Sequence, residues 1–230
     1  MTSVFMSTVK AGMSACLLVA LPLWAHATSI DVFAMPSDSV VKTMQQTSDT
    51  LHSYGIDSFY RQGKPVHITL YLTEFPSSAQ EKITQIVQRF AKTQAPFPIT
   101  ASGVTVTKGH WAFIDVKRSA ALQRLADEIT LALEPLRVSD PTMPDWVKAY
   151  PNKQAAFERY GSPNVFQNFT PHLTLVGGET NPNLAKFAKA MHQHPPYVQG
   201  KIVGIGVGIT DKWGQQKTIL GEYRFNKAQP

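Results

Sequence analysis

Two stretches of the sequence repeat one four-residue pattern, in which a histidine and a threonine alternate with apolar residues. The first is His67-Ile68-Thr69-Leu70 and the second is His172-Leu173-Thr174-Leu175. A histidine with a pKa of about 6.5 can act as a base or an acid near neutrality, and a threonine hydroxyl can donate a hydrogen bond to a phosphoryl oxygen. Two such pairs facing each other are suited to acid–base chemistry on a phosphate.

Each motif has the composition of a short β-strand bounded by turn-forming residues. Pro65 lies two residues before the first histidine, and Pro171 directly precedes the second. Side chains alternate between the faces of a strand, so the histidine and threonine of one motif project together while the aliphatic residues pack behind them. The sequence predicts strands at about residues 66–73 and 171–176, each presenting an imidazole beside a hydroxyl.

The segments that follow the two motifs also resemble each other. Each motif strand is followed by a predicted helix and two predicted strands, and a Gly-Val-x-Val/Ile-Thr string recurs at residues 103–107 and 206–210. We interpret this as an internal duplication, because units of this size form two lobes rather than a solenoid. The predicted fold class is α+β, with two pseudo-symmetric lobes that face each other across a central cleft. Each lobe is expected to be a mostly antiparallel sheet with helices outside.

The lobes are expected to form one bilobal domain over residues 28–230, with halves at about 60–134 and 165–225. Prolines interrupt the chain between these halves, and the stretch 135–170 reads as an insertion that can reshape the cleft. Further strands are expected at residues 30–35, 99–107, 111–116, 201–210 and 218–225, and helices after Ser37, Ser77, Ser119 and Asn181.

Residues 1–27 are predicted to be a secretory signal peptide. They carry one lysine, an apolar stretch and Ala25-His26-Ala27, a small-x-small site that fits cleavage after Ala27. The apolar stretch is too short and too interrupted by proline for a membrane span. Cys16, the single cysteine, leaves with the signal peptide, so the mature chain has no disulfide. We expect an exported, periplasmic protein without a membrane span.

The formal net charge of +6 favours anionic ligands. The basic residues do not form a dense run, so the sequence does not indicate a long nucleic-acid track, and we expect no DNA partner. The expected partner is a nucleotide or an RNA end, bound by a monomer.

The two motifs, lying in equivalent places of duplicated halves, resemble the two-histidine (2H) phosphoesterase superfamily. That superfamily includes the RNA 2′,3′-cyclic phosphodiesterases, also called 2′-5′ RNA ligase-like proteins, and the resemblance covers residues 30–225. It implies that each motif lies on a central strand of its lobe and that the four polar side chains meet at the cleft. By this resemblance His67 and His172 are catalytic, Thr69 and Thr174 bind the phosphate, and no cofactor or metal is required. The family analogy favours His67 as the acid and His172 as the base.

Three aromatic residues near the predicted strands are candidates for stacking on a nucleobase. They are Tyr71, Trp111 and Phe169. Two histidines near a predicted helix end, His192 and His194, are interpreted as part of a solvated turn rather than as metal ligands, because no other ligands accompany them. The glycines at 204, 206 and 208 share one strand face, which predicts close packing of a neighbour and not a dinucleotide loop.

The resulting prediction is an exported, metal-independent phosphodiesterase that hydrolyses the 2′,3′-cyclic phosphate of RNA ends or small cyclic nucleotides. The main alternative is a non-catalytic exported protein that binds nucleotide or RNA in the same pocket. A third interpretation is a structural periplasmic protein whose histidines bond only to the backbone.

Overall fold

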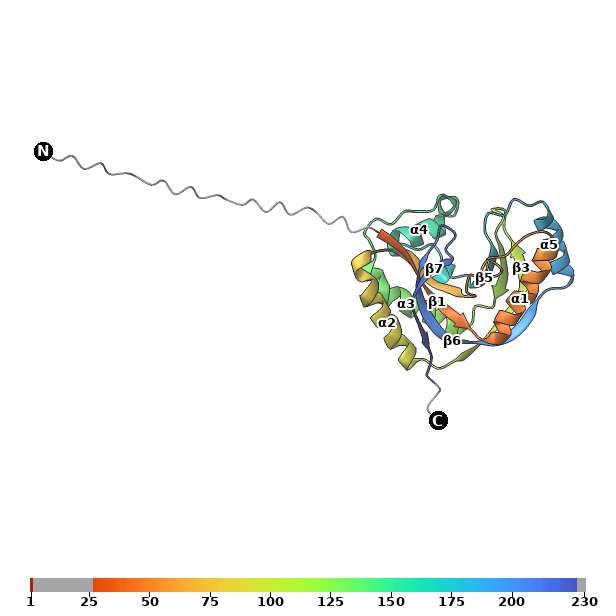
Figure 1. Cartoon of the computed structure of the whole chain (residues 1–230), viewed down its shortest axis with the longest axis horizontal. Helices are drawn as coiled ribbons and strands as arrows, with labels where there is room; N and C mark the ends of the chain where they lie inside the picture. The colour runs from red at the N-terminus through yellow and green to blue at the C-terminus, as the bar shows by residue number, and fades with distance from the viewer. Residues whose placement is uncertain (2–26, 227–230) are drawn as a thin grey trace.

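The computed structural model describes residues 27–226, together with Met1, and folds them around one seven-stranded sheet (Figure 1). The predicted signal peptide therefore lies outside the described residues, apart from its two end residues. None of the helices described is long and apolar enough to cross a membrane. The strands are β1 (Ala27–Pro36), β2 (Ile68–Pro76), β3 (Phe97–Val106), β4 (Ala112–Val116), β5 (His172–Val176), β6 (Tyr197–Thr210) and β7 (Gln216–Arg224). The α-helices are α1 (Asp38–Ser53), α2 (Gln80–Thr93), α3 (Ala120–Leu133), α4 (Pro151–Tyr160) and α5 (Asn183–Gln193).

The strands run in the order β2-β1-β6-β3-β4-β5, and β7 also pairs with β6. All of these pairings are antiparallel, which confirms the predicted α+β class. The two lobes share one continuous sheet because β6 is 14 residues long. Its residues 197–202 pair with β3, and its residues 202–209 pair with β1. One strand therefore serves both lobes.

The two halves of the chain exchange strands within this sheet. Along the sequence both halves run strand, helix, strand, strand, as β2-α2-β3-β4 and β5-α5-β6-β7. In space, however, β3 and β4 lie in the same part of the sheet as β5, whereas β1 and the last part of β6 lie in the part that contains β2. The halves at 60–134 and 165–225 thus have the same order of elements along the chain. Each part of the sheet, however, contains strands from both halves.

The motif strands lie at the two ends of the hydrogen-bonded order, so the expectation that each occupies the centre of a lobe is wrong. β2 pairs only with β1, and β5 pairs only with β4. The curved sheet brings these end strands into contact with each other. As a result the two motifs meet across the space between the lobes, although no ladder joins their strands.

Four of the helices, α1, α2, α3 and α5, cover the outer surfaces of the two parts of the sheet (Figure 1). α2 and α3 pack against β7 and β2, and α1 and α5 pack against β6 and β3. Ser119 caps α3, because its hydroxyl accepts a hydrogen bond from the amide of Leu122. The side chain of Asn181 similarly accepts a bond from the amide of Asn183 at the start of α5. These caps agree with the helix starts expected from the sequence.

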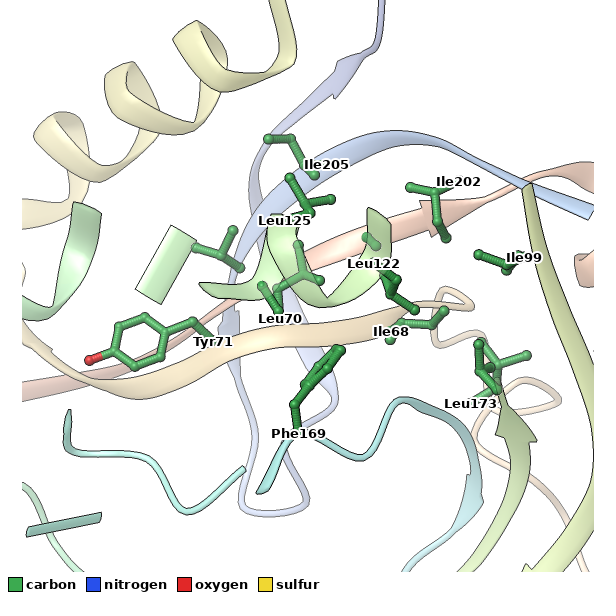
Figure 2. Packing of buried hydrophobic residues seen from close by; sticks show 14 of the residues in the cluster. Ile68, Leu70, Tyr71, Ile99, Leu122, Leu125, Phe169, Leu173, Ile202 and Ile205 are labelled. Carbon is green, nitrogen blue, oxygen red and sulfur yellow. The ribbon is translucent and has the colours of Figure 1, made fainter. Parts of the chain in front are cut away.

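The aliphatic residues of both motifs lie in one hydrophobic core. Ile68 and Leu173 are at most 1% exposed and lie near Ile99, Leu122 and Ile202 (Figure 2). Burying a side chain of this size contributes about 1.5–3 kcal/mol. This burial holds one face of each motif strand in the core, and because side chains alternate, it directs the histidine and threonine to the other face.

Candidate active site

The two motif histidines make the same hydrogen bond to the backbone. Nδ1 of His67 lies 2.9 Å from the carbonyl oxygen of Pro65, and Nδ1 of His172 lies 2.8 Å from that of Thr170. A carbonyl oxygen can only accept, so Nδ1 is the donor in both rings. In the neutral form of each histidine, Nε2 therefore carries the free lone pair. Both motifs present the same nitrogen for proton transfer, as a pair of proton carriers requires.

A phenylalanine packs against each histidine from the neighbouring strand. Phe33 of β1 pairs in register with Thr69, and its ring lies 5.5 Å from that of His67. Phe113 of β4 pairs with Thr174, and its ring lies 4.1 Å from that of His172. The ladder shifts register immediately before both phenylalanines. A phenylalanine thus takes the equivalent position beside each histidine, which supports the duplication inferred from the sequence.

The first motif contacts a buried carboxyl group that sequence reasoning did not single out. Asp31 of β1 has no exposed surface. Its Oδ2 accepts hydrogen bonds from the Thr69 hydroxyl at 3.1 Å and from the Gln216 side-chain amide at 2.8 Å. The same oxygen lies 3.6 Å from Nε2 of His67. Its signal in the sequence is a single acidic residue inside an apolar strand.

The glycine face of β6 makes room for this arrangement. A Cβ on Gly206 would meet the ring of Phe33, and a Cβ on Gly208 would meet the side chain of Gln216. Both contacts would be far closer than ordinary van der Waals distance. The prediction that these glycines allow close packing of a neighbour is confirmed, and the neighbours are the residues that support His67 and Asp31.

Burial shifts the protonation of these groups. It lowers the pKa of His67 to about 4, against the opposing effect of the bond to the Pro65 carbonyl. It also lowers the pKa of His172, against the bond to the Thr170 carbonyl and the charge of Asp115. Burial raises the pKa of Asp31 to about 8, although the bonds from Thr69 and Gln216 oppose this. In the free protein at neutral pH, both histidines are therefore neutral and Asp31 carries a proton.

A small pocket lies where the two motifs meet. His67 of the first motif and Thr174 of the second line it, together with Lys64 and Gln215. The ammonium group of Lys64 lies 3.0 Å from the carboxylate of Asp211. Thr69 is not among the lining residues, since its hydroxyl is bonded to Asp31. The pocket combines a proton carrier, a hydroxyl donor and a cation, which suits an anionic ligand.

The aromatic candidates fall into two groups. Tyr71 has no exposed surface and donates its hydroxyl to the carbonyl of Tyr160 at 2.6 Å, and Phe169 is 2% exposed. The expectation that these two rings stack on a base is wrong, because both are packed in the core. Trp111 is half-buried and lies beside Phe113, which in turn contacts His172. Trp213, which sequence reasoning missed, packs edge-on against Trp111 with ring centroids 5.8 Å apart.

The insertion between the halves also approaches the second motif. α4 is attached to the loop before β5 by the hydrogen bond from Asn152 to Asn168 at 2.8 Å. The charge of Lys153 on this helix lowers the pKa of His172, which places the ammonium group within electrostatic reach of the imidazole. The insertion thus brings a second cation to the site.

The sequence comparison with protein families identified one match. A family model described as the 2′-5′ RNA ligase superfamily matches residues 36–212, a segment that contains both motifs. A search among curated proteins found no match.

Three solved structures resemble the fold. The protein TT0787 of Thermus thermophilus is 14% identical, covers 87% of this chain and 100% of its own, and has a TM-score of 0.56. Escherichia coli LigT complexed with NADP+ is 15% identical, with coverages of 87% and 99% and a TM-score of 0.48. Kluyveromyces marxianus Usb1 is 12% identical, with coverages of 86% and 98% and a TM-score of 0.47. The T. thermophilus protein shares the overall fold of this chain.

Proposed function

Because this chain belongs to the 2′-5′ RNA ligase superfamily, we propose that it is a phosphodiesterase that opens the 2′,3′-cyclic phosphate of RNA ends or small cyclic nucleotides. Phosphoesterase or ligase chemistry is the general activity of this superfamily. The observation that carries the finer proposal is the matched pair of histidines. Each has Nδ1 bonded to a carbonyl two residues earlier and Nε2 left for proton transfer.

The proposed reaction needs one base and one acid. Nε2 of His172 takes a proton from water, and the water oxygen forms a bond to phosphorus. The bond from phosphorus to one ribose oxygen breaks, and that oxygen receives a proton from Nε2 of His67. The product is a phosphate monoester with a free ribose hydroxyl. Donors such as the Thr174 hydroxyl stabilise the charge on the phosphoryl oxygens.

The surroundings of the site support a nucleotide rather than a simple phosphodiester. Lys153 supplies positive charge near the second motif, and Lys64 places an ammonium group, paired with Asp211, in the pocket beside the first motif. The ring of Trp111 stacks on Phe113, and Phe113 in turn contacts His172. A base attached to the reacting ribose can therefore stack on Trp111. We also propose that the protein acts outside the cytoplasm, on the basis of the signal-like segment at residues 1–27.

The test is turnover of 2′,3′-cyclic nucleotides and of oligonucleotides ending in a 2′,3′-cyclic phosphate, with and without EDTA. We expect hydrolysis to a monoester that is unaffected by the chelator. Loss of activity with EDTA, restored by a divalent ion, would replace two-histidine catalysis with metal-assisted hydrolysis. Tight binding of these ligands without any turnover would favour a nucleotide-binding protein instead.

A further inference from the structure

We propose that Asp31 is a positioning residue that shares one proton with His67, and that this buried pair, rather than the histidine alone, supplies the acid of the reaction. The role of the pair in catalysis rests on the proposed function, whereas the shared proton does not. A histidine with a pKa of about 4 carries no proton at neutral pH, yet one of the two histidines must give a proton to the leaving oxygen.

The two side chains approach within ion-pair distance, slightly farther apart than a direct hydrogen bond. Nδ1 of His67 already donates to the Pro65 carbonyl, so Nε2 is the nitrogen that gains or loses a proton. Nε2 lies 3.6 Å from Oδ2 of Asp31. His67 is 6% exposed and Asp31 is 0% exposed, so both groups belong to the protein interior. The Thr69 hydroxyl and the Gln216 amide hold Oδ2 in this position.

The burial of the pair determines how many protons it holds. With no proton the pair carries one negative charge, and with two protons it carries one positive charge. A net charge on the pair is unfavourable in free energy at a buried position. With one proton the pair is neutral and avoids this cost. The other oxygen of the carboxyl group, Oδ1, has no hydrogen-bond partner among the described residues, which further penalises an ionised Asp31.

The other charged groups near the pair favour neither the state with no proton nor the state with two protons. His172 lowers the pKa of His67 and Asp211 raises it. Asp211 is itself neutralised by Lys64 at 3.0 Å. The pKa of His67, about 4, and that of Asp31, about 8, bracket the neutral range. Between these two pH values Asp31 carries a proton and His67 carries none, so the two groups together hold a single proton.

Within residues 27–226, the second motif has no fully buried carboxyl group at the equivalent position. Asp31 lies two residues before Phe33, the residue paired with Thr69. The corresponding position before Phe113 is Trp111. Asp115 pairs in register with His172, but it is only partly buried and accepts a hydrogen bond from the Thr105 hydroxyl at 2.8 Å. Of the two motifs, therefore, the first alone has a buried proton donor beside its histidine, which assigns the acid to His67 and the base to His172.

The proton balance of the cycle follows from this assignment. The pair gives its proton through Nε2 of His67 to the leaving ribose oxygen, and Asp31 is left as a carboxylate. The Thr69 hydroxyl and the Gln216 amide already donate to Oδ2 and stabilise that charge. His172 holds the proton taken from water and releases it to solvent, and the pair regains one proton from solvent when the product leaves.

The shared proton is tested by nuclear magnetic resonance titration of the histidine rings without substrate. In the wild-type protein the His67 ring is expected to report two steps, near pH 4 and near pH 8. In Asp31→Asn the upper step is expected to disappear. Asp115→Asn is the matched control, since it removes the carboxylate that acts on His172 and should leave both steps of His67 in place. A single step near pH 6.5 in the wild-type protein would overturn the proposal, even if the Asp31 variant failed to fold.

The catalytic role is tested by the pH dependence of kcat/KM on a 2′,3′-cyclic nucleotide. Activity of the wild-type protein should fall above about pH 8, and that of Asp31→Asn should fall above about pH 4. At pH 7.5 the variant should lose on the order of 10²-fold or more, and recover much of this loss at pH 5. An equal loss at every pH would indicate a merely structural role and overturn the proposal. Absence of wild-type turnover together with a two-step titration would reject the proposed function and retain the proton pair.

Discussion

His67 and Thr174 line the same pocket, although His67 directly precedes β2 and Thr174 lies on β5 at the opposite end of the strand order. The histidine of one motif therefore lies beside the threonine of the other. Thr69, the partner of His67 within its own motif, is instead bonded to Asp31. The two motifs form one site, but their threonines have different surroundings. Thr174 lines the pocket, and Thr69 is bonded to a buried carboxyl group.

Replacing either histidine by alanine should remove most turnover. A general acid or base contributes about 10²–10⁴-fold, and groups that act in one step are not additive, so the double variant should be little slower than either single one. The measurement is kcat on a cyclic nucleotide for His67→Ala and His172→Ala. His192→Ala, near the end of α5, is the control and should keep wild-type activity. Near-normal turnover in either motif variant would contradict two-histidine catalysis.

The two threonines should differ in what they contribute. Thr174→Val removes a hydroxyl from the pocket wall, so kcat should fall by about 10-fold or more with little change in stability. Thr69→Val leaves Oδ2 of Asp31 with one donor fewer, so we expect the alkaline limb of the pH profile to move to higher pH. Both variants keep the strand preference of the residue. Identical pH profiles for the two variants would show that Thr69 does not act through Asp31.

Trp111 should affect substrate binding more than the chemical step. Its ring is half-buried and contacts Phe113, which in turn contacts His172. Loss of stacking on one base costs about 1–3 kcal/mol, so Trp111→Ala should raise KM by roughly 5- to 150-fold while kcat changes little. Tyr197→Ala is the matched control, because that ring is 64% exposed at the start of β6. An equal effect of both substitutions would argue against a base at Trp111.

Stability should fall as the pH rises from about 6.5 to 8.5. The folded-state pKa of Asp31, about 8, lies above its ordinary value of 3.8, so its contribution to stability is lost as pH rises through the folded value. The folded-state pKa of His67, about 4, lies below 6.5, so its contribution is complete above that pH and does not offset the loss.

Urea unfolding at pH 6.5 and 8.5 measures this change. Asp31→Asn should abolish most of the pH dependence in this window. Asp38→Asn, at an exposed position of α1, should leave it intact. A wild-type protein that is equally stable at both pH values would show that Asp31 is ionised throughout the range.

The chain should begin at Thr28 after export. Expression with the native N-terminus in a bacterium, followed by mass spectrometry of the periplasmic fraction, is the measurement. Cleavage after Ala27 would remove only the first residue of β1 and leave the pair of Thr28 with Phe75 in place. Intact Met1 on protein recovered outside the cytoplasm would contradict this expectation.

The sequence alone was sufficient to identify the motifs, the element order and the family. These depend on local patterns: alternation of polar and aliphatic residues along each motif strand, helix caps such as Ser119, and the recurrence of one pattern in two halves. The glycines of β6 were also informative. A strand face without side chains allows a neighbouring side chain to pack against the backbone in any fold.

Tertiary structure decided which residues surround the motifs. Asp31 reaches Thr69 and Gln216 from positions far apart in the chain, and the exchange of strands between the halves cannot be read from local patterns. The same limit explains Tyr71 and Phe169, whose aromatic character fits a base platform and a core equally well. Burial and long-range pairing arise only when the whole sheet closes, and they place the fully buried Asp31 beside His67.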